Sequence, residues 1–267
     1  MTAGEVRSSP PLPGDPRFPA QPTLEEVGRA RLWLFRHGVR TTLPTRLIAL
    51  RAGSRSTTPS LVLVSLAAFV GAWATASIDD PPFAHAAGAL VLAVAFAVWT
   101  LVRRQAARYR DQLAAQFVEP GGRPSPSTAA GLVGAWSFVS FGITFIGGAA
   151  LYGTLVVISP PMRSAAAVSL VVLGVGLVPA GLALLDAFTA PVIAEDEASA
   201  AVDRFLRSQD VRRFVLPAAF AWLAGINAPV AWQPLQLGYL ALAIGTQLAG
   251  WLHGNRRRLP PGWYGLP

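Results

Sequence analysis

Long apolar stretches without a charged residue constrain this chain more than any other feature of its sequence. Bilayer hydrocarbon is about 30 Å thick, so a helix that crosses it needs roughly 20 apolar residues. Charged residues make up only 13% of the 267 residues, whereas a soluble domain carries about 25%. We therefore predict an all-α, polytopic helical membrane protein. About six transmembrane helices are expected, at residues 61–78, 83–102, 131–158, 165–185, 214–231 and 235–252.

Short connections are expected on one side of the membrane, at residues 79–82, 159–164 and 229–234. A short connection places consecutive helices antiparallel, so the spans are predicted to form three antiparallel hairpins within a transmembrane domain at 56–253. The fifth span is the least regular, because it is interrupted by Pro217, Gly225, Asn227 and Pro229. A shallow re-entrant pair formed with the sixth span is the alternative for this segment.

All 22 basic residues are arginines, and their positions predict which side of the membrane each segment occupies. If the N-terminus is cytoplasmic, the inner segments hold 21 arginines and the outer connections hold one, Arg163. Positive residues concentrate on the cytoplasmic side. We therefore predict a multi-pass protein of the bacterial cell (inner) membrane with both termini in the cytoplasm. The net charge of +8 is attributed to anionic lipids and not to nucleic acid. The arginines expected to contact anionic lipid are Arg29, Arg36, Arg40, Arg46, Arg51, Arg103, Arg104, Arg212 and Arg213.

Both ends of the chain are predicted to lie at the cytoplasmic surface. Residues 1–22 form a proline-rich disordered arm, and residues 254–267 form a basic tail. Between the arm and the first span, residues 23–55 are predicted to form basic amphipathic helices in the membrane interface. These helices would serve either as a passive anchor or as an elbow that grips a partner.

Local signals place the ends of these interfacial helices. Thr23 and Glu26 have the spacing of a capping box, so the first helix is expected to begin there. Gly38 is predicted to end it. A second short helix is expected from residue 45 to residue 52, with Gly53 as its stop.

The two long cytoplasmic linkers are also predicted to be largely helical. The second span is expected to continue as a helix to Val118, where Pro120, Gly121 and Gly122 break it. In the linker 186–213, acidic residues at 195–197 begin a predicted helix that ends with arginines. Acid first and base last complements the helix dipole, so we interpret these carboxylates as structural and not as a calcium site.

Small and polar residues concentrate in the third span. Ser140, Thr144 and Gly148 recur every four residues, a spacing that favours close packing of two helices. The alternative is one wall of a hydrated transport path, with polar residues of the last two spans opposite. The residues of this packing seam or path are Ser137, Ser140, Thr144, Gly148, Tyr152, Asn227 and Gln247.

Residues that support catalysis or metal binding are scarce. The chain has no cysteine, and its three histidines are far apart in sequence. Ser137 and Ser140 lack a histidine or aspartate partner at the same depth. We therefore predict no catalytic residues, no metal, no cofactor and no enzymatic activity. The sequence also lacks the glycine-rich phosphate loop of nucleotide-hydrolysing proteins, so energy for any transport would come from another chain.

These features favour the permease or membrane-anchor subunit of a transport or export complex that a separate partner, such as a cytoplasmic ATPase, energises. In outline, the arrangement resembles the six-span permeases of ABC-2-type exporters. Those proteins also have an interfacial N-terminal elbow, a cytoplasmic segment after the second span and a short final outer hairpin. Two alternatives stay open: a scaffold or envelope-assembly protein without transport, and a lipid-modifying membrane enzyme. A homo-oligomer is compatible with each of them.

Overall fold

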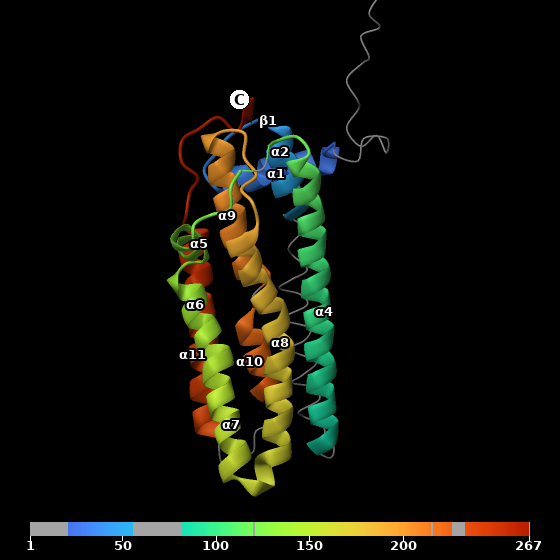
Figure 1. Cartoon of the computed structure of the whole chain (residues 1–267), viewed down its shortest axis with the longest axis vertical. Coiled ribbons are helices and arrows are strands. Elements are labelled where there is room, and N and C mark those ends of the chain that lie inside the picture. Colours follow the sequence, from blue (N-terminus) through green and yellow to red (C-terminus); the bar gives the residue numbers. More distant parts are fainter. Residues whose placement is uncertain (1–20, 56–81, 120, 215, 226–232, 267) are drawn as a thin grey trace, which may run out of the picture.

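A bundle of long helices with a group of shorter elements at one end makes up the protein (Figure 1). The computed structural model describes residues 21–55, 82–119, 121–214, 216–225 and 233–266. We call the long helices the bundle. We call the shorter elements the head; these are α1 (Leu24–Arg36), α2 (Arg46–Arg55), α9 (Glu197–Phe214), β1 (Leu43–Pro44) and β2 (Gly265–Leu266).

Four helical segments of the described chain are long and apolar enough to cross a membrane: Gly88–Ala115, Ala135–Ile158, Pro160–Thr189 and Pro234–Asn255. They overlap the second, third, fourth and sixth predicted spans. The predicted helical fold is therefore confirmed, and these four helices are compatible with a membrane protein. The predicted first span, 61–78, lies outside the described residues, as do 226–231 of the fifth. The count of six spans and the hairpin arrangement remain predictions.

The described part of the fifth span is the short helix α10 (Pro217–Gly225), which has nine residues. Nine residues of α-helix extend only about 14 Å, less than half of the hydrocarbon thickness. The next helix in sequence, α11 (Gln233–Asn255), has 23 residues and is long enough to cross a membrane. Phe220 of α10 is almost fully buried in the bundle core, so the short helix is an internal packing element there.

The helix α4 (Pro82–Ala115) has 34 residues and links the bundle to the head. It is about 51 Å long, well beyond the thickness of hydrocarbon. The sequence predicts this extension, and the helix ends three residues before the expected Val118. The extra turns carry Arg104, Arg108 and Asp111 to the head end of the bundle.

The third predicted span is a helix with two irregularities. It consists of α5 (Pro126–Val133), α6 (Ala135–Phe141), the π-helix η1 (Gly142–Gly147) and α7 (Gly148–Ile158). Gly134 has φ of +80° and separates α5 from α6, a conformation that favours glycine. A 3-10 turn, η2 (Pro160–Met162), then leads into α8 (Arg163–Thr189).

The head has its own apolar core. Trp33 and Leu34 of α1 pack with residues of α2, α9 and the C-terminal tail, and β1 pairs antiparallel with β2. This face of α1 therefore packs on protein, while Leu24, Leu32 and Phe35 stay exposed on its other side. The tail, predicted as a basic cytoplasmic segment, contributes Leu259 and Tyr264 to this core, and the C-terminus lies at the head (Figure 1).

The predicted start and stop signals of the N-terminal helices can be compared with the structure one by one. The capping box is confirmed: Glu26 N–H donates to Thr23 Oγ1, and Thr23 N–H donates to Glu26 Oε2. Gly38 follows α1 with φ of +88°, as predicted. The predicted stop at Gly53 is wrong, because α2 continues to Arg55. Gly53 is instead a contact position, where a Cβ atom would lie 2.3 Å from the Glu26 carbonyl oxygen.

We expect Gly53→Ala to destabilise the head, because the added methyl group would force α1 and α2 apart. Overpacking of this kind costs about 1–3 kcal/mol. The matched control is Gly28→Ala on α1, where nothing lies within 4 Å of the added Cβ, and a gain in helix propensity is expected. Thermal unfolding of both variants in detergent measures the difference. Equal midpoints for the two variants would contradict this packing.

Candidate functional site

Buried ion pairs join the head to the bundle. Arg51 of α2 contacts Asp203 of α9 at 2.6 Å and Asp111 of α4 at 2.8 Å. Arg55, one turn further along α2, contacts Asp111 at 2.6 Å and Asp210 of α9 at 2.9 Å. The side chains of Arg51 and Asp203 are 3% and 0% exposed. Three helices that are distant in sequence therefore meet through ion pairs whose arginines are almost fully buried, while the side chains of Asp111 and Asp210 stay 24% and 20% exposed.

The N–H groups of these buried arginines, and of the neighbouring Arg207, donate further hydrogen bonds to the protein. Arg51 also donates to the Ile193 carbonyl at 3.0 Å, and Arg207 donates to Asp203 at 2.7 Å and to the Ala190 carbonyl at 2.7 Å. A buried charge is tolerated only when its hydrogen bonds are satisfied in this way. We call the set of Arg51, Arg55, Asp111, Asp203, Arg207 and Asp210 the junction.

The two arginines of α2 in the junction stay protonated although they are buried. Burial by itself would lower the pKa of Arg55, but the nearby carboxylates of Asp111 and Asp210 outweigh burial and hold that pKa above its ordinary value. The pKa of Arg51 is raised against the same effect of burial, mainly by Asp111 and Asp203. Both guanidinium groups therefore stay charged at any pH at which the protein is handled.

The junction changes the interpretation of two arginines predicted to contact lipid. Arg51 is buried inside the junction, so a contact with lipid headgroups is contradicted for this residue. Arg104 donates two hydrogen bonds to Asp186 of α8, at 2.6 and 2.8 Å, and is largely buried. Its guanidinium ties α4 to α8.

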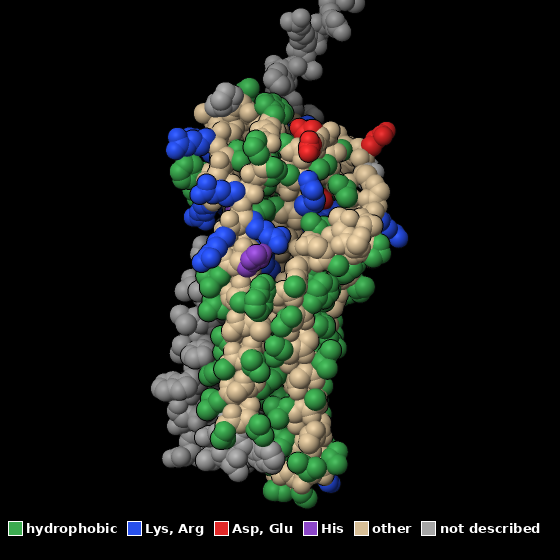
Figure 2. All heavy atoms as spheres, turned by 90° about the vertical axis from the view of Figure 1, so that its left-hand side faces the viewer, with side chains coloured by type: hydrophobic (Ala, Val, Ile, Leu, Met, Phe, Trp, Pro, Cys, Tyr) green, Lys and Arg blue, Asp and Glu red, His purple; other side chains and the backbone are tan. Residues whose placement is uncertain are grey.

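The other predicted lipid-contacting arginines lie at the same end of the molecule. Arg36, Arg40 and Arg46 are exposed in the head, and Arg29 pairs with Glu25 on the surface of α1. Arg46 also stacks on the Phe117 ring at 3.6 Å, and Arg103 lies over Trp99 at 5.7 Å. Arg212 packs against Gly254, and the side chain of Arg213 lies outside the described residues. Figure 2 shows blue side chains at the head end of one face, above a surface rich in hydrophobic residues.

The third-span residues predicted as a seam or a path fall into two groups. Thr144, Gly148 and Tyr152 are buried where the third span meets α8 and α11. Tyr239 of α11 donates to the Thr144 carbonyl at 2.7 Å, and a Cβ on Gly148 would lie 2.6 Å from the Tyr239 hydroxyl oxygen. This half of the face is closely packed, in the manner of a seam.

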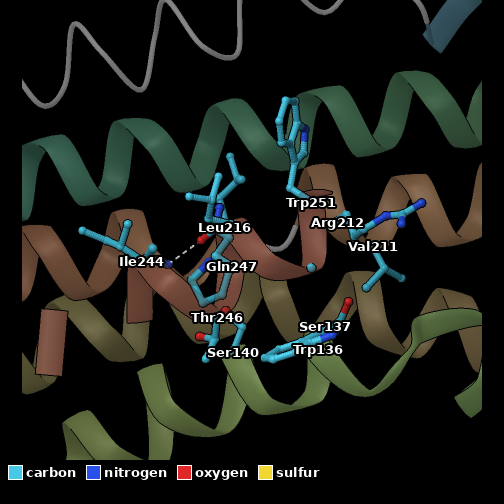
Figure 3. Close-up of a pocket in the computed structure, with 14 residues that line it drawn as sticks. Trp136, Ser137, Ser140, Val211, Arg212, Leu216, Ile244, Thr246, Gln247 and Trp251 are labelled. Atoms are coloured by element: carbon cyan, nitrogen blue, oxygen red, sulfur yellow. Dashed lines mark hydrogen bonds between the residues drawn. The ribbon is translucent and has the colours of Figure 1, made fainter. Parts of the chain in front are cut away.

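The second group lines a cavity of about 250 Å³ between α6, α11, α10 and the end of α9. Ser137 and Ser140 of α6 and Gln247 of α11 contribute its polar wall, with Arg212 at the α9 side (Figure 3). The indole rings of Trp136 and Trp251 come from the two facing helices (Figure 3). The wall is otherwise mostly apolar, so the cavity suits an apolar group with few hydrogen-bonding atoms.

Gln247 has a clear structural role at this cavity. Its side-chain oxygen accepts a hydrogen bond from the backbone N–H of Ala218 at 2.8 Å, the dashed line of Figure 3. Ala218 lies in the first turn of α10, where N–H groups have no partner within the helix. Gln247 therefore caps α10 from the neighbouring helix. Asn227, predicted opposite the same path, lies outside the described residues.

The hydroxyl groups of Ser140 and Thr144 are buried and have no hydrogen-bond partner among the described residues. A serine nucleophile needs a base, and none of the described residues that line the cavity with Ser140 is a histidine or a carboxylate. Within the described part of the chain, no cluster of three or more His, Cys, Asp or Glu could hold a metal ion. The cavity offers shape and a few polar atoms for binding, and the described residues place no acid–base pair in it.

Comparisons with protein-family models, with curated proteins and with solved structures found no match to this chain.

We expect Asp203→Asn to destabilise the protein by about 3 kcal/mol or more, because it removes the carboxylate that compensates buried Arg51 and Arg207. The control is Glu195→Gln, an exposed acid just before α9, with an expected change within about 0.5 kcal/mol. Thermal unfolding in detergent and limited proteolysis of the head measure both. An Asp203→Asn variant as stable as its control would show that the junction does not hold the head.

Two buried serines test whether the Figure 3 cavity is dry. Ser169 of α8 donates to the Ala224 carbonyl at 2.6 Å, so Ser169→Ala should cost about 1 kcal/mol. Ser140→Ala should change stability by less than about 0.5 kcal/mol or raise it, because its hydroxyl has no partner to lose among the described residues. Unfolding midpoints of the two variants give the comparison. An equal loss for both serines would indicate that ordered water binds Ser140, as a hydrated path requires.

Proposed function

We propose that this chain is the membrane-embedded subunit of a transport or export complex, acting as permease or membrane anchor. In this proposal the head lies in the cytoplasm, and a separate partner such as an ATPase supplies the energy. The arginine distribution supports the orientation, with 21 of 22 arginines on the inner side of the predicted spans. The absence of a phosphate-binding loop from the sequence supports the need for a partner.

The exposed apolar face of α1 is the observation that carries the proposal. Leu24, Leu32 and Phe35 are 75%, 51% and 59% exposed, and they share one side of the helix. They are not needed for the head core, which uses the opposite side of α1. Exposed apolar residues grouped on a helix that the rest of the protein holds in place are typical of a docking surface. An amphipathic helix of a partner, or a groove on it, would cover them.

The head is attached so that force on α1 reaches the bundle. Glu26 of α1 pairs with Arg110 of α4 at 2.7 Å, and the junction ties α2 and α9 to the same helix. Arg104 then ties α4 to α8. A partner that moved α1 would move the two long helices with it, which is the mechanical requirement of a subunit driven from the cytoplasm.

The scaffold alternative is favoured by a different observation. The core of the described bundle is packed, with Phe96, Val172 and Phe220 in one apolar cluster. A packed core suits a protein that only holds partners together, and it also suits the resting state of a permease. The two functions differ in whether an energy-supplying partner binds.

The test is co-purification of the full chain from its native membranes in mild detergent. We expect an ATPase to co-purify with the wild-type protein and to be lost, by about tenfold or more, when Leu32 and Phe35 are both changed to Asp, because charge would disrupt the apolar contact. Gln116→Asp, an exposed change at the head end of α4, is the matched control and should retain the partner.

Each outcome of this test decides one part of the proposal. If no ATPase accompanies the wild-type chain, the energised-subunit proposal is wrong and the scaffold alternative gains. If the ATPase is retained by the double variant, the subunit role stands and the assignment of α1 as its docking face is wrong.

A further inference from the structure

A second, larger cavity lies where the bundle meets the head. It has a volume of about 460 Å³ and is bordered by α2, α4, the linker that carries Arg123, the end of α8 with the residues 190–193 that follow it, and α9. Its charged lining is predominantly basic: the arginines are Arg51, Arg55, Arg104, Arg108, Arg123 and Arg207. The acids that line it are Asp111, Asp186 and Asp210. None of the sequence patterns indicated this cavity, because its walls come from five separate segments.

The charges of this cavity do not balance. Four of the lining arginines form ion pairs with four aspartates. In the junction, the three arginines pair with the three aspartates. Outside the junction, Arg104 pairs with Asp186. Two of the six lining arginines remain after these pairings, Arg108 and Arg123. The cavity therefore carries a surplus of about two positive charges beside groups that are already paired.

Arg108 lies on the cavity side of α4 without a short ion pair. Its guanidinium is 3.7 Å from Asp186, and both oxygens of that carboxylate already accept hydrogen bonds from Arg104. The Arg108 side chain is 52% exposed, so its donors are available to a ligand.

Arg123 is held over the cavity by a contact between two linkers. Gly121 N–H donates to the Val192 carbonyl at 2.8 Å, and Val192 N–H donates to the Gly122 carbonyl at 3.3 Å. A Cβ on Gly121 would already touch Val192 at 3.3 Å, so the two segments are close. Among the described residues, no carboxylate pairs with Arg123. The linker thus places Arg123 at the cavity, where its exposed side chain has no carboxylate partner among the described residues.

We propose that this cavity binds a phosphate-bearing anion, with Arg108 and Arg123 as its direct contacts. Two guanidinium groups with unused donors match the several oxygens of a phosphate, which accept paired N–H bonds. Its volume is that of a small-ligand site, so a headgroup-sized phosphate ester fits and a folded partner does not. The neighbouring pairs Arg104–Asp186 and Arg55–Asp111 keep the site in shape, so they position its walls without contacting the ligand.

The phosphate has two possible sources, a membrane lipid and a soluble phosphate ester. The cavity lies at the head end of two candidate spans, those that end at Ala115 and Thr189. Basic pockets between membrane helices at this depth are typical binding sites for anionic lipid headgroups. The same donors would also accept a free phosphate ester from the aqueous side, so the experiment compares both.

The test compares three forms of the full chain in detergent. They are the wild type, the cavity variant, which carries both Arg108→Gln and Arg123→Gln, and the tail variant, which carries both Arg256→Gln and Arg257→Gln. The last pair removes the same charge from exposed tail residues outside the cavity. In one arm, native mass spectrometry measures binding of phosphatidylglycerol, with phosphatidylcholine as the neutral comparison. In the other arm, thermal shift measures binding of glycerol 3-phosphate and inorganic phosphate.

We expect phosphatidylglycerol to bind the wild-type and tail variants alike, and to bind the cavity variant about tenfold or more weakly. The same pattern with glycerol 3-phosphate alone would support the site and assign it to a soluble ester. Equal binding by all three proteins in both arms, or no binding by the wild type, would overturn the proposal. If the double variant unfolds, Arg123→Gln alone provides the test, because this exposed residue makes no ion pair within the described chain. No partner protein takes part, so the outcome is independent of the proposed energised complex.

Discussion

The contact of Arg51 and Arg55 with Asp111 is the interaction on which the rest of the structure depends. A buried charge is stable only when opposite charge and hydrogen bonds surround it, so α2, α4 and α9 must meet in one arrangement to satisfy all three residues. This requirement explains why α4 continues beyond the length that hydrocarbon needs. It also explains how the head keeps a fixed position on the bundle, from which α1 presents its apolar face and the linkers shape the basic cavity.

Local patterns in the sequence predict the helices well and their contacts poorly. The capping box at Thr23, the turn at Gly38 and the extension of α4 each depend on residues within a few positions of one another, and the structure confirms all three. Gly53 is a residue type that often ends a helix, but here its small size allows close packing against Glu26, which lies on another helix. Pairing of Arg51 with Asp203 joins positions 152 residues apart, and no periodicity indicates such a partner.

The candidate site shows the same difference between helices, which the sequence predicts, and contacts between helices, which it does not. Small and polar residues every four positions predict a packing face on the third span, and Ser140, Thr144 and Gly148 of that face are buried. The spacing does not indicate what each residue does there. Gly148 packs closely against Tyr239, and Gln247 caps α10. Ser140 lines a small cavity, and its hydroxyl has no hydrogen-bond partner in the part of the chain that the structure describes. The basic cavity was missed for a further reason. Arg108 and Arg123 are recognisable as special only after the partners of the other arginines are known.

The most direct test of this account is the distance between head and bundle. Because the chain contains no cysteine, spin labels can be attached to cysteines introduced at the exposed positions Thr42 in the head and Gln105 on α4. Pulsed EPR should give one narrow distance distribution, and adding Asp111→Asn should broaden it, because the head then loses the carboxylate shared by Arg51 and Arg55. An equally narrow distribution in both proteins would contradict the claim that these buried ion pairs hold the head on the bundle.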